Sequence, residues 1–134
     1  FINHCYYVQP FKYHADRNHG LHRNKYLATL SKELPSSYMR ESDPLIGGGY
    51  VRPLYLQPIF QQKKFNLHDH DVNDLDYSMG LCPITERMHF DELITHEFIR
   101  PTMSKGDLDQ VIEAFLKVDK HMSEVITRQH EIKA

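Results

Sequence analysis

Large apolar side chains recur at helical spacing between His22 and Leu34. They follow i, i+1, i+4, i+8 spacing, with basic and amide side chains among them, and they are Tyr26, Leu27, Leu30 and Leu34. This spacing places them on one face of a helix of about three turns. Pro35 stops the helix and disfavours the helical conformation of the residue before it. We therefore predict a helix over residues 22–34 that packs one face against the rest of the protein.

The longest regular pattern begins at Ser104. Ser104 with Asp107 three residues on resembles a capping box in which Asp replaces the usual Glu or Gln. Apolar side chains then keep helical spacing over five turns, at Leu108, Val111, Ile112, Phe115, Val118, Met122 and Val125. Polar and charged side chains cover the opposite face. The pattern predicts a long amphipathic helix at the C-terminal end of the chain.

Two other stretches alternate with a period of two, as strands do. Residues 4–13 place Tyr7, Phe11 and Tyr13 on one face, and residues 93–99 alternate in the same way. Pro10 cannot donate a ladder hydrogen bond, so the first strand is expected at an edge or a bulge. Between these strands, residues 14–20 have the composition of a turn, and a short helix is expected from Ile84 to about Phe90, after Pro83.

These elements define the expected fold class. We predict one α+β domain over residues 1–134, with a small, largely antiparallel sheet, helices on one face and the longest helix at the C-terminus. A chain of this length is one domain by size and can bury a hydrophobic core.

The stretch 47–60 differs from both patterns. Three consecutive glycines precede a segment rich in proline, tyrosine and large apolar residues. Glycine loses more backbone entropy on ordering than any other residue, so we expect these glycines to allow a sharp turn or a close approach and not to stabilise a helix or strand. Such a loop presents contacts to a ligand or partner. The alternative is a buried crossover between two elements.

Tyr50, Arg52 and Tyr55 are the candidate binding residues of this loop. An arginine beside aromatic rings suits a phosphate, a carboxylate or a sugar nucleotide. In this hypothesis the three side chains stay at least partly exposed, while the core anchors are Leu54, Ile59 and Phe60. The alternative pairs Arg52 with one of the 18 acidic residues of the chain.

Composition excludes several classes of function. The net charge of −2 and the pI near 6.6 give no general attraction to nucleic acid or to an acidic membrane. No apolar run approaches the roughly 20 residues that span a bilayer, and no signal-peptide pattern is visible. Cys5 and Cys82 lie far apart without a disulfide-scaffold pattern, so we expect a reducing, cytoplasmic setting.

Ten histidines are unusual for this length. The run His68-Asp69-His70-Asp71 offers two imidazoles and two carboxylates, which are metal ligands in principle. A third ligand would have to come from elsewhere, so we favour a solvated acidic loop within residues 66–80 and assign no metal site. Catalytic motifs are lacking as well, because the glycines are not followed by the Lys-Ser/Thr of a P-loop and no Gly-x-Ser-x-Gly elbow occurs.

The order of the pieces resembles the C-terminal small domain of the DegT/DnrJ/EryC1/StrS family of pyridoxal-phosphate-dependent sugar aminotransferases. Residues 5–34 resemble the strand and helix that open that domain, and residues 82–118 resemble its Pro-x-x-Glu-Arg block, strand and final helix. Residues 50–60 match its Tyr-x-Pro-Leu loop, reading Tyr50-Val51-Arg52-Pro53-Leu54-Tyr55-Leu56-Gln57-Pro58-Ile59-Phe60. The three stretches cover most of the chain, and their shared order carries the resemblance.

The resemblance implies a fragment that is not catalytic by itself. In the family a larger preceding domain holds pyridoxal phosphate and the lysine of its Schiff base, and no lysine here lies in a context like that motif. The resemblance therefore assigns no catalytic residue and no cofactor to this chain. It makes Tyr50, Arg52 and Tyr55 contributors to a nucleotide-sugar pocket that is completed by the large domain, and it leaves a homodimer open. A sister dehydratase is equally compatible.

The competing hypothesis is a stand-alone ligand- or metal-binding module that uses the 47–60 loop or the His68–Asp71 loop. The first residue is Phe1 and not methionine, which favours a piece of a larger protein. The sequence upstream of the gene segment separates the two hypotheses, because only the fragment hypothesis requires a cofactor-binding domain there.

Overall fold

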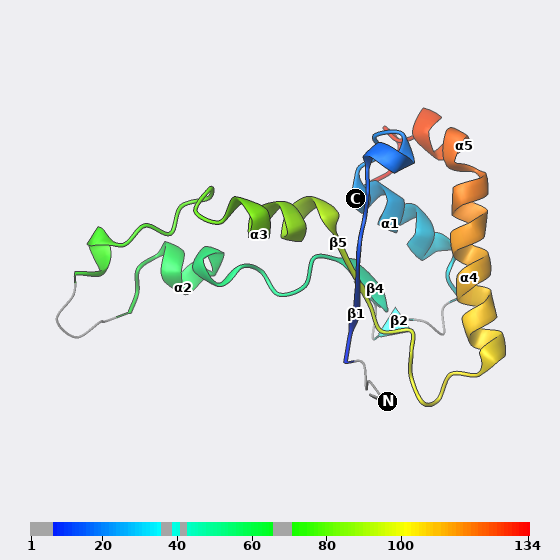
Figure 1. The fold of residues 1–134 in the computed structure, drawn as a ribbon, viewed down its shortest axis with the longest axis horizontal. Coiled ribbons are helices and arrows are strands. Elements are labelled where there is room, and N and C mark those ends of the chain that lie inside the picture. Colours follow the sequence, from blue (N-terminus) through cyan, green and yellow to red (C-terminus); the bar gives the residue numbers. More distant parts are fainter. Residues whose placement is uncertain (1–6, 36–38, 41–42, 66–70) are drawn as a thin grey trace, which may run out of the picture.

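The computed structural model describes residues 7–35, 39–40, 43–65 and 71–134. Its architecture is α+β, as predicted, and it divides into a body and an arm (Figure 1). The body contains β1 (Gln9–Lys12), α1 (Arg23–Glu33), β2 (Met39–Arg40), β3 (Asp43–Pro44), β4 (Ile46–Gly48), β5 (Leu93–His96), α4 (Lys105–Lys120) and α5 (Met122–Thr127).

The arm consists of residues 50–65 and 71–87 and projects to the left of the body in Figure 1. Its elements are short: a 3-10 helix over Leu54–Leu56, α2 (Pro58–Gln61), a 3-10 helix over Val72–Asp74, and α3 (Pro83–Arg87). The helix α3 continues into the body as a π-helical turn over Met88–Glu92. Together this helix and turn include all the residues of the short helix that the sequence predicts from Ile84 to Phe90.

The sheet of the body is antiparallel and has the order β1-β5-β4. Gln9 pairs with His96, and Ile46 pairs with the same residue from the other side. The strand β1 therefore lies at an edge, as its proline predicts, and β5 lies in the centre, where Ile94 has no exposed surface. A separate two-stranded ladder joins β2 to β3.

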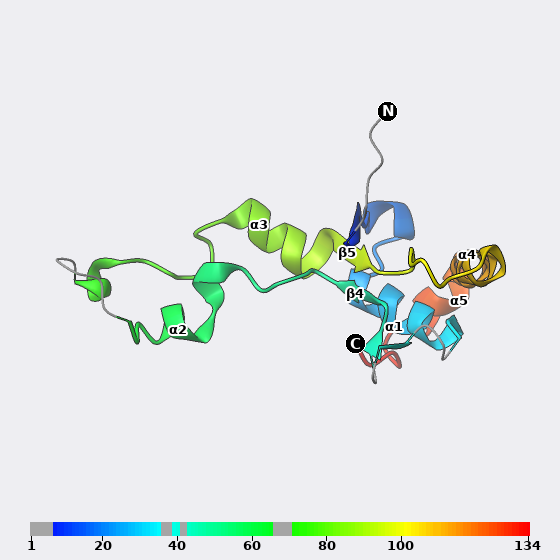
Figure 2. The same ribbon diagram turned by 90° about the horizontal axis from the view of Figure 1, so that it is seen from below.

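The helices α1 and α4 cover the sheet and close one core. Figure 2 shows α1 beneath the three strands, with α4 and α5 on the side away from the arm. The helix α1 packs against both β4 and α4. The core contains the positions that the two helical patterns predict to be buried, among them Tyr26, Leu27, Leu30, Leu34, Val111, Val118 and Met122. None of the helices in the described parts of the chain is long and apolar enough to cross a membrane.

The C-terminal helix begins as predicted and ends earlier. The side chain of Ser104 accepts from the backbone of Asp107, and the carboxylate of Asp107 accepts from the backbone of Ser104, which completes the capping box. The single run of five turns predicted to Val125 is wrong, because the helix breaks at His121. There the imidazole Nδ1 donates to the carbonyl of Lys117 at 2.9 Å. The chain then resumes as α5, whose first residue, Met122, is buried.

We predict that Ser104→Ala lowers the free energy of unfolding by about 1 kcal/mol, the usual effect of losing an N-cap. The substitution leaves the Asp107 amide without its side-chain acceptor. Chemical denaturation measures the change, and Ser123→Ala on the exposed surface of α5 is the control, expected to stay within about 0.5 kcal/mol. Equal effects at both positions would contradict a stabilising role for the capping box.

Candidate functional site

The glycine segment joins the sheet to the candidate loop. Gly47 and Gly48 lie inside β4, paired with Thr95 and Ile94, so two of the three glycines belong to a strand that the sequence analysis did not predict. Gly49 follows with a φ of 71°, a left-handed conformation that favours glycine. Its amide donates to the carbonyl of Leu93 at 2.7 Å, which ties the start of the loop to β5.

The side chain of Arg23 explains the glycine at position 48. A Cβ atom at Gly48 would lie 2.7 Å from both Nε and Nη2 of Arg23, closer than real Cβ contacts allow. The expectation of a close approach at the glycines is therefore confirmed. The surface that the backbone approaches is a buried guanidinium, of which 3% is exposed.

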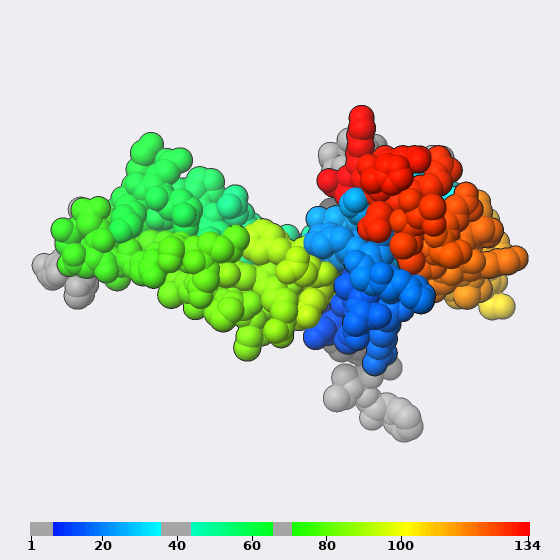
Figure 3. All heavy atoms as spheres, turned by 90° about the horizontal axis from the view of Figure 1, so that it is seen from above, coloured from blue at the N-terminus to red at the C-terminus, as the bar shows by residue number. Residues whose placement is uncertain are grey.

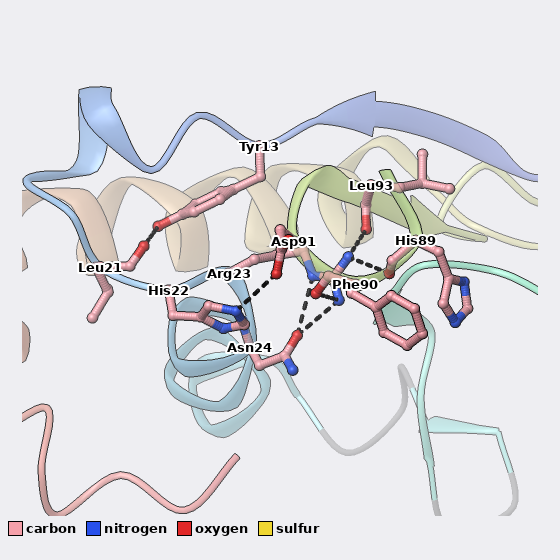
Figure 4. A network of polar contacts seen from close by, with 9 residues as sticks. All are labelled: Tyr13, Leu21, His22, Arg23, Asn24, His89, Phe90, Asp91 and Leu93. Carbon is pink, nitrogen blue, oxygen red and sulfur yellow. Dashed lines mark hydrogen bonds and ion pairs between the residues drawn. The ribbon is translucent and has the colours of Figure 1, made fainter. Parts of the chain in front are cut away.

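All five N–H groups of this guanidinium donate hydrogen bonds (Figure 4). Nη1 donates to the carbonyls of His89 at 2.8 Å and Leu93 at 2.9 Å, and Nη2 donates to that of Phe90 at 2.7 Å. Nε and Nη2 share the side-chain oxygen of Asn24. Burial lowers the pKa of Arg23, while the charge of Asp91 acts in the opposite direction. The guanidinium thus holds together α1, β5 and the π-helical turn at the root of the arm.

The N-terminus of α1 is fixed to the same turn through a second side chain. The Nδ1 atom of His22 accepts from the amide of Asn24, which makes His22 the N-cap of α1. Its Nε2 atom lies 3.3 Å from a carboxylate oxygen of Asp91 and therefore donates to it (Figure 4). Two consecutive residues of α1, His22 and Arg23, therefore bind the root of the arm.

His89 is a neighbour of the loop that the sequence analysis did not assign to it. A Cβ at Gly49 would lie 2.8 Å from the Nδ1 atom of His89 and 2.8 Å from its carbonyl oxygen, so the imidazole lies directly against the loop. Burial lowers the pKa of His89, and the charges of Arg23 and Arg52 lower it further. Gly49 and His89 are brought together by the register of β4 against β5. No local sequence pattern predicts this contact.

The three predicted binding residues divide into two kinds. Tyr50 and Arg52 are exposed, and Tyr50 has 52% of its surface accessible. Tyr55 is half-buried, and its hydroxyl donates to the carboxylate of Glu86. Burial and this hydrogen bond raise the pKa of Tyr55 to about 12. Tyr50 and Arg52 therefore face solvent, whereas Tyr55 connects the two chain segments of the arm.

The carboxylate of Glu86 organises the arm. Besides Tyr55, it accepts from the amide of Gly80 at 2.7 and 2.9 Å and from that of Cys82 at 3.4 Å. The hydrogen bond from Tyr55 is the main cause of the lowered pKa of Glu86. Gln61 adds a second connection, since its amide donates to the carbonyls of Tyr55 and of Tyr77.

The predicted core anchors of the loop are wrong, because none of Leu54, Ile59 and Phe60 belongs to the buried core. Leu54 is 71% exposed and Ile59 is 51% exposed, whereas Leu56, only 4% exposed, is buried instead. Phe60 packs on the arm itself, in a cluster with two other aromatic rings, Phe65 and Tyr77. The arm projects away from the core, so a loop residue can be anchored in the arm without reaching the core of the body.

Exposed apolar side chains concentrate on the arm. Of the thirteen large hydrophobic residues that are exposed in the described part of the chain, eight belong to it: Tyr50, Val51, Leu54, Ile59, Leu75, Met79, Leu81 and Ile84. Figure 3 shows that the arm stands clear of the body, so no part of the body covers it from that side. A concentration of exposed apolar side chains in one part of a molecule is typical of an interaction site.

Metal ligands do not gather in the described residues, where no group of three or more His, Cys, Asp or Glu side chains could hold an ion. His68, Asp69 and His70 lie outside the described residues. Asp71 is described, and its carboxylate accepts from the backbone and side-chain amides of Asn73, as the cap of a 3-10 helix.

Comparisons with protein-family models, with curated proteins and with solved structures found no significant match to this chain.

We predict that Gly48→Ala lowers the free energy of unfolding by about 1–3 kcal/mol, because the new methyl group displaces the Arg23 guanidinium from its acceptors. Gly47→Ala is the matched control. It lies in the same strand with nothing within 4 Å of a Cβ, so we expect a change within about 0.5 kcal/mol. Chemical denaturation compares the two variants, and equal losses would mean that strand structure and not the arginine requires the glycine.

We predict that His89 makes the fold less stable in acid. Because the folded protein holds the pKa of His89 below its usual value of 6.5, the unfolded chain takes up the proton first as the pH falls. Stability should therefore decrease as the pH falls below about 6.5. Denaturation from pH 7.5 to 5 should show a smaller decrease in His89→Gln than in the wild type, while the exposed control His130→Gln should behave as the wild type. An unchanged slope in His89→Gln would refute the prediction.

Proposed function

We propose that this chain is the C-terminal small domain of a pyridoxal-phosphate-dependent nucleotide-sugar aminotransferase or of a related dehydratase. The three collinear motifs support the proposal at the level of sequence. The observation that carries it is the geometry of the Tyr50–Arg52 segment, which is exposed at its tip and fixed at its root by Arg23 and Gly49. An exposed arginine two residues from a tyrosine in the sequence suits a nucleotide sugar, whose phosphates accept from the guanidinium.

The proposed partner is the large domain of the same parent chain. The arm offers an exposed apolar surface beside Tyr50 and Arg52, and an interface with a preceding domain would cover both. In this arrangement Tyr50 and Arg52 form one wall of the nucleotide-sugar pocket. Tyr55 keeps the arm in shape through Glu86, so its contribution to the pocket is indirect.

We assign pyridoxal phosphate to the large domain, because no lysine of this chain lies in a context like the family's Schiff-base motif. The cofactor chemistry depends on a lysine that forms an aldimine, and such a lysine is held in a pocket. The buried charged side chain among the described residues is an arginine, Arg23, and not a lysine, and its N–H donors are all engaged within the protein. Two lysines, Lys32 and Lys117, line a pocket of the body, but neither lies in a context like that motif. The cofactor therefore belongs to the large domain in this proposal.

Arg52→Ala tests the proposal in two settings. In the isolated chain Arg52 is exposed, so we expect the free energy of unfolding to change by less than about 0.5 kcal/mol. In a chain extended upstream through the expected cofactor domain, the same substitution should weaken nucleotide-sugar binding about tenfold, the usual effect of losing a charged hydrogen bond. Arg17→Ala, at an exposed arginine outside the arm, is the control and should change neither quantity.

Two outcomes contradict the proposal. A loss of several kcal/mol from Arg52→Ala in the isolated chain would show that the loop is structural. A saturable aldimine absorbance band on adding pyridoxal phosphate to the isolated chain, dependent on one lysine, would show that the chain holds the cofactor itself. Upstream sequence without a cofactor domain would instead favour the stand-alone binding module.

A further inference from the structure

A pocket lies between the ends of α1 and α4, the helix α5 and the C-terminal segment. Its volume is about 410 Å³, within the range of small-molecule sites. It belongs to the body and lies away from the arm, because α5 and the end of α4 are on the opposite side in Figures 1 and 3. The proposed function makes no use of it.

The pocket combines an apolar floor with a charged rim. The floor is formed by Val118, which is 2% exposed, and by the partly buried Val125 and Ile132. The C-terminal wall is held in place by α1, since Lys25 donates to the carbonyl of Gln129 at 2.6 Å. The pocket therefore offers an apolar surface to a ligand, and its C-terminal wall is held in place by the contact with α1.

The acidic side chains of the rim are already engaged. Glu33 is paired with Lys117, and Glu131 accepts from Nε and Nη2 of Arg128 at 3.0 and 2.8 Å. Glu124 lies 3.9 Å from the same guanidinium. Each carboxylate at the rim thus faces a cation of the protein, which leaves little attraction for a positively charged ligand.

Lys32 is the cation of the rim that pairs with no carboxylate among the described residues. The rim contains three carboxylates and three basic side chains, so its formal net charge is zero, and Lys117 and Arg128 are the two basic side chains engaged with the carboxylates. Lys32 is therefore the cation with which an anionic group of a ligand can pair. A phosphate group with two negative charges would find a single available lysine and would be repelled by the three carboxylates of the rim. A ligand with one carboxylate needs only that lysine as its partner.

We propose that this pocket binds a small monocarboxylate with a compact aliphatic body. The carboxylate meets the ammonium group of Lys32, and the aliphatic part covers Val118, Val125 and Ile132. The Nδ1–H of His121 is bound to the carbonyl of Lys117, so in the neutral ring Nε2 is an acceptor at the rim. A hydroxyl group on the ligand therefore finds a second polar contact there.

Titration of the 134-residue chain with 4-methylpentanoate, followed by two-dimensional NMR, tests the proposal. We expect saturable shifts at the amides of Val125 and Ile132. The matched probes 4-methylpentylamine and 4-methylpentan-1-ol should bind at least about tenfold more weakly, because they lack the charge that Lys32 recognises.

Two substitutions separate the charge from the apolar floor. Lys32→Ala should weaken binding of 4-methylpentanoate about tenfold and leave the weak binding of the alcohol unchanged. Ile132→Asp should weaken both, and Lys105→Ala, at the exposed far end of α4, should affect neither. The spectra of the free variants confirm that each is folded. Shifts that do not saturate, equal binding of the amine, or unchanged binding in Lys32→Ala would overturn the proposal.

Discussion

The buried guanidinium of Arg23 is the interaction on which the arrangement of body and arm depends. It is charged, and no carboxylate of the described residues is bound directly to it, so the charge is stabilised by three main-chain carbonyls and one amide oxygen. Two of the carbonyls belong to the π-helical turn, where the negative end of the helix dipole favours a cation. Removing the guanidinium would take one donor from each of these part-buried carbonyls; that of Leu93 keeps its hydrogen bond from Gly49, and each carbonyl left unsatisfied costs about 1–3 kcal/mol. The direction in which the arm leaves the sheet is thus set by α1, a helix that is distant from it in sequence.

The body and the arm are stabilised by different means. The body buries aliphatic and aromatic side chains from α1, α4 and the sheet in one continuous core. The arm buries Leu56 and otherwise depends on polar contacts, chiefly those of Glu86, and on three aromatic rings. Hydrogen bonds near solvent contribute less than core burial, so we infer that the arm opens at a lower free energy than the body. An interface that covers its apolar side chains would raise that free energy.

The elements with strong periodicity could be predicted from sequence, and the contacts between them could not. The spacing of Tyr26, Leu27 and Leu30 marked α1 and its buried face, and Pro10 correctly placed β1 at an edge. The exposure of Leu54 was predicted wrongly because hydrophobicity does not show whether a loop lies over the core or projects away from it. Gly48 was understood as a position of close approach, but its neighbour Arg23 becomes visible only when the strands are paired. The role of Tyr50 and Arg52 in binding stays a prediction.

The chain segments that lead into and out of the arm are hydrogen-bonded to each other through Gly49, whose amide donates to Leu93 and whose carbonyl accepts from the Thr95 hydroxyl. The arm is therefore a long insertion between two paired strands, and the chain leaves and re-enters the body at the same point of the sheet. Each doubling of the length of a flexible loop costs only about 0.6 kcal/mol of closure entropy. Evolution can therefore lengthen, shorten or exchange the outer part of the arm while the sheet and its core stay the same. Partner or ligand specificity can diversify there without a new fold.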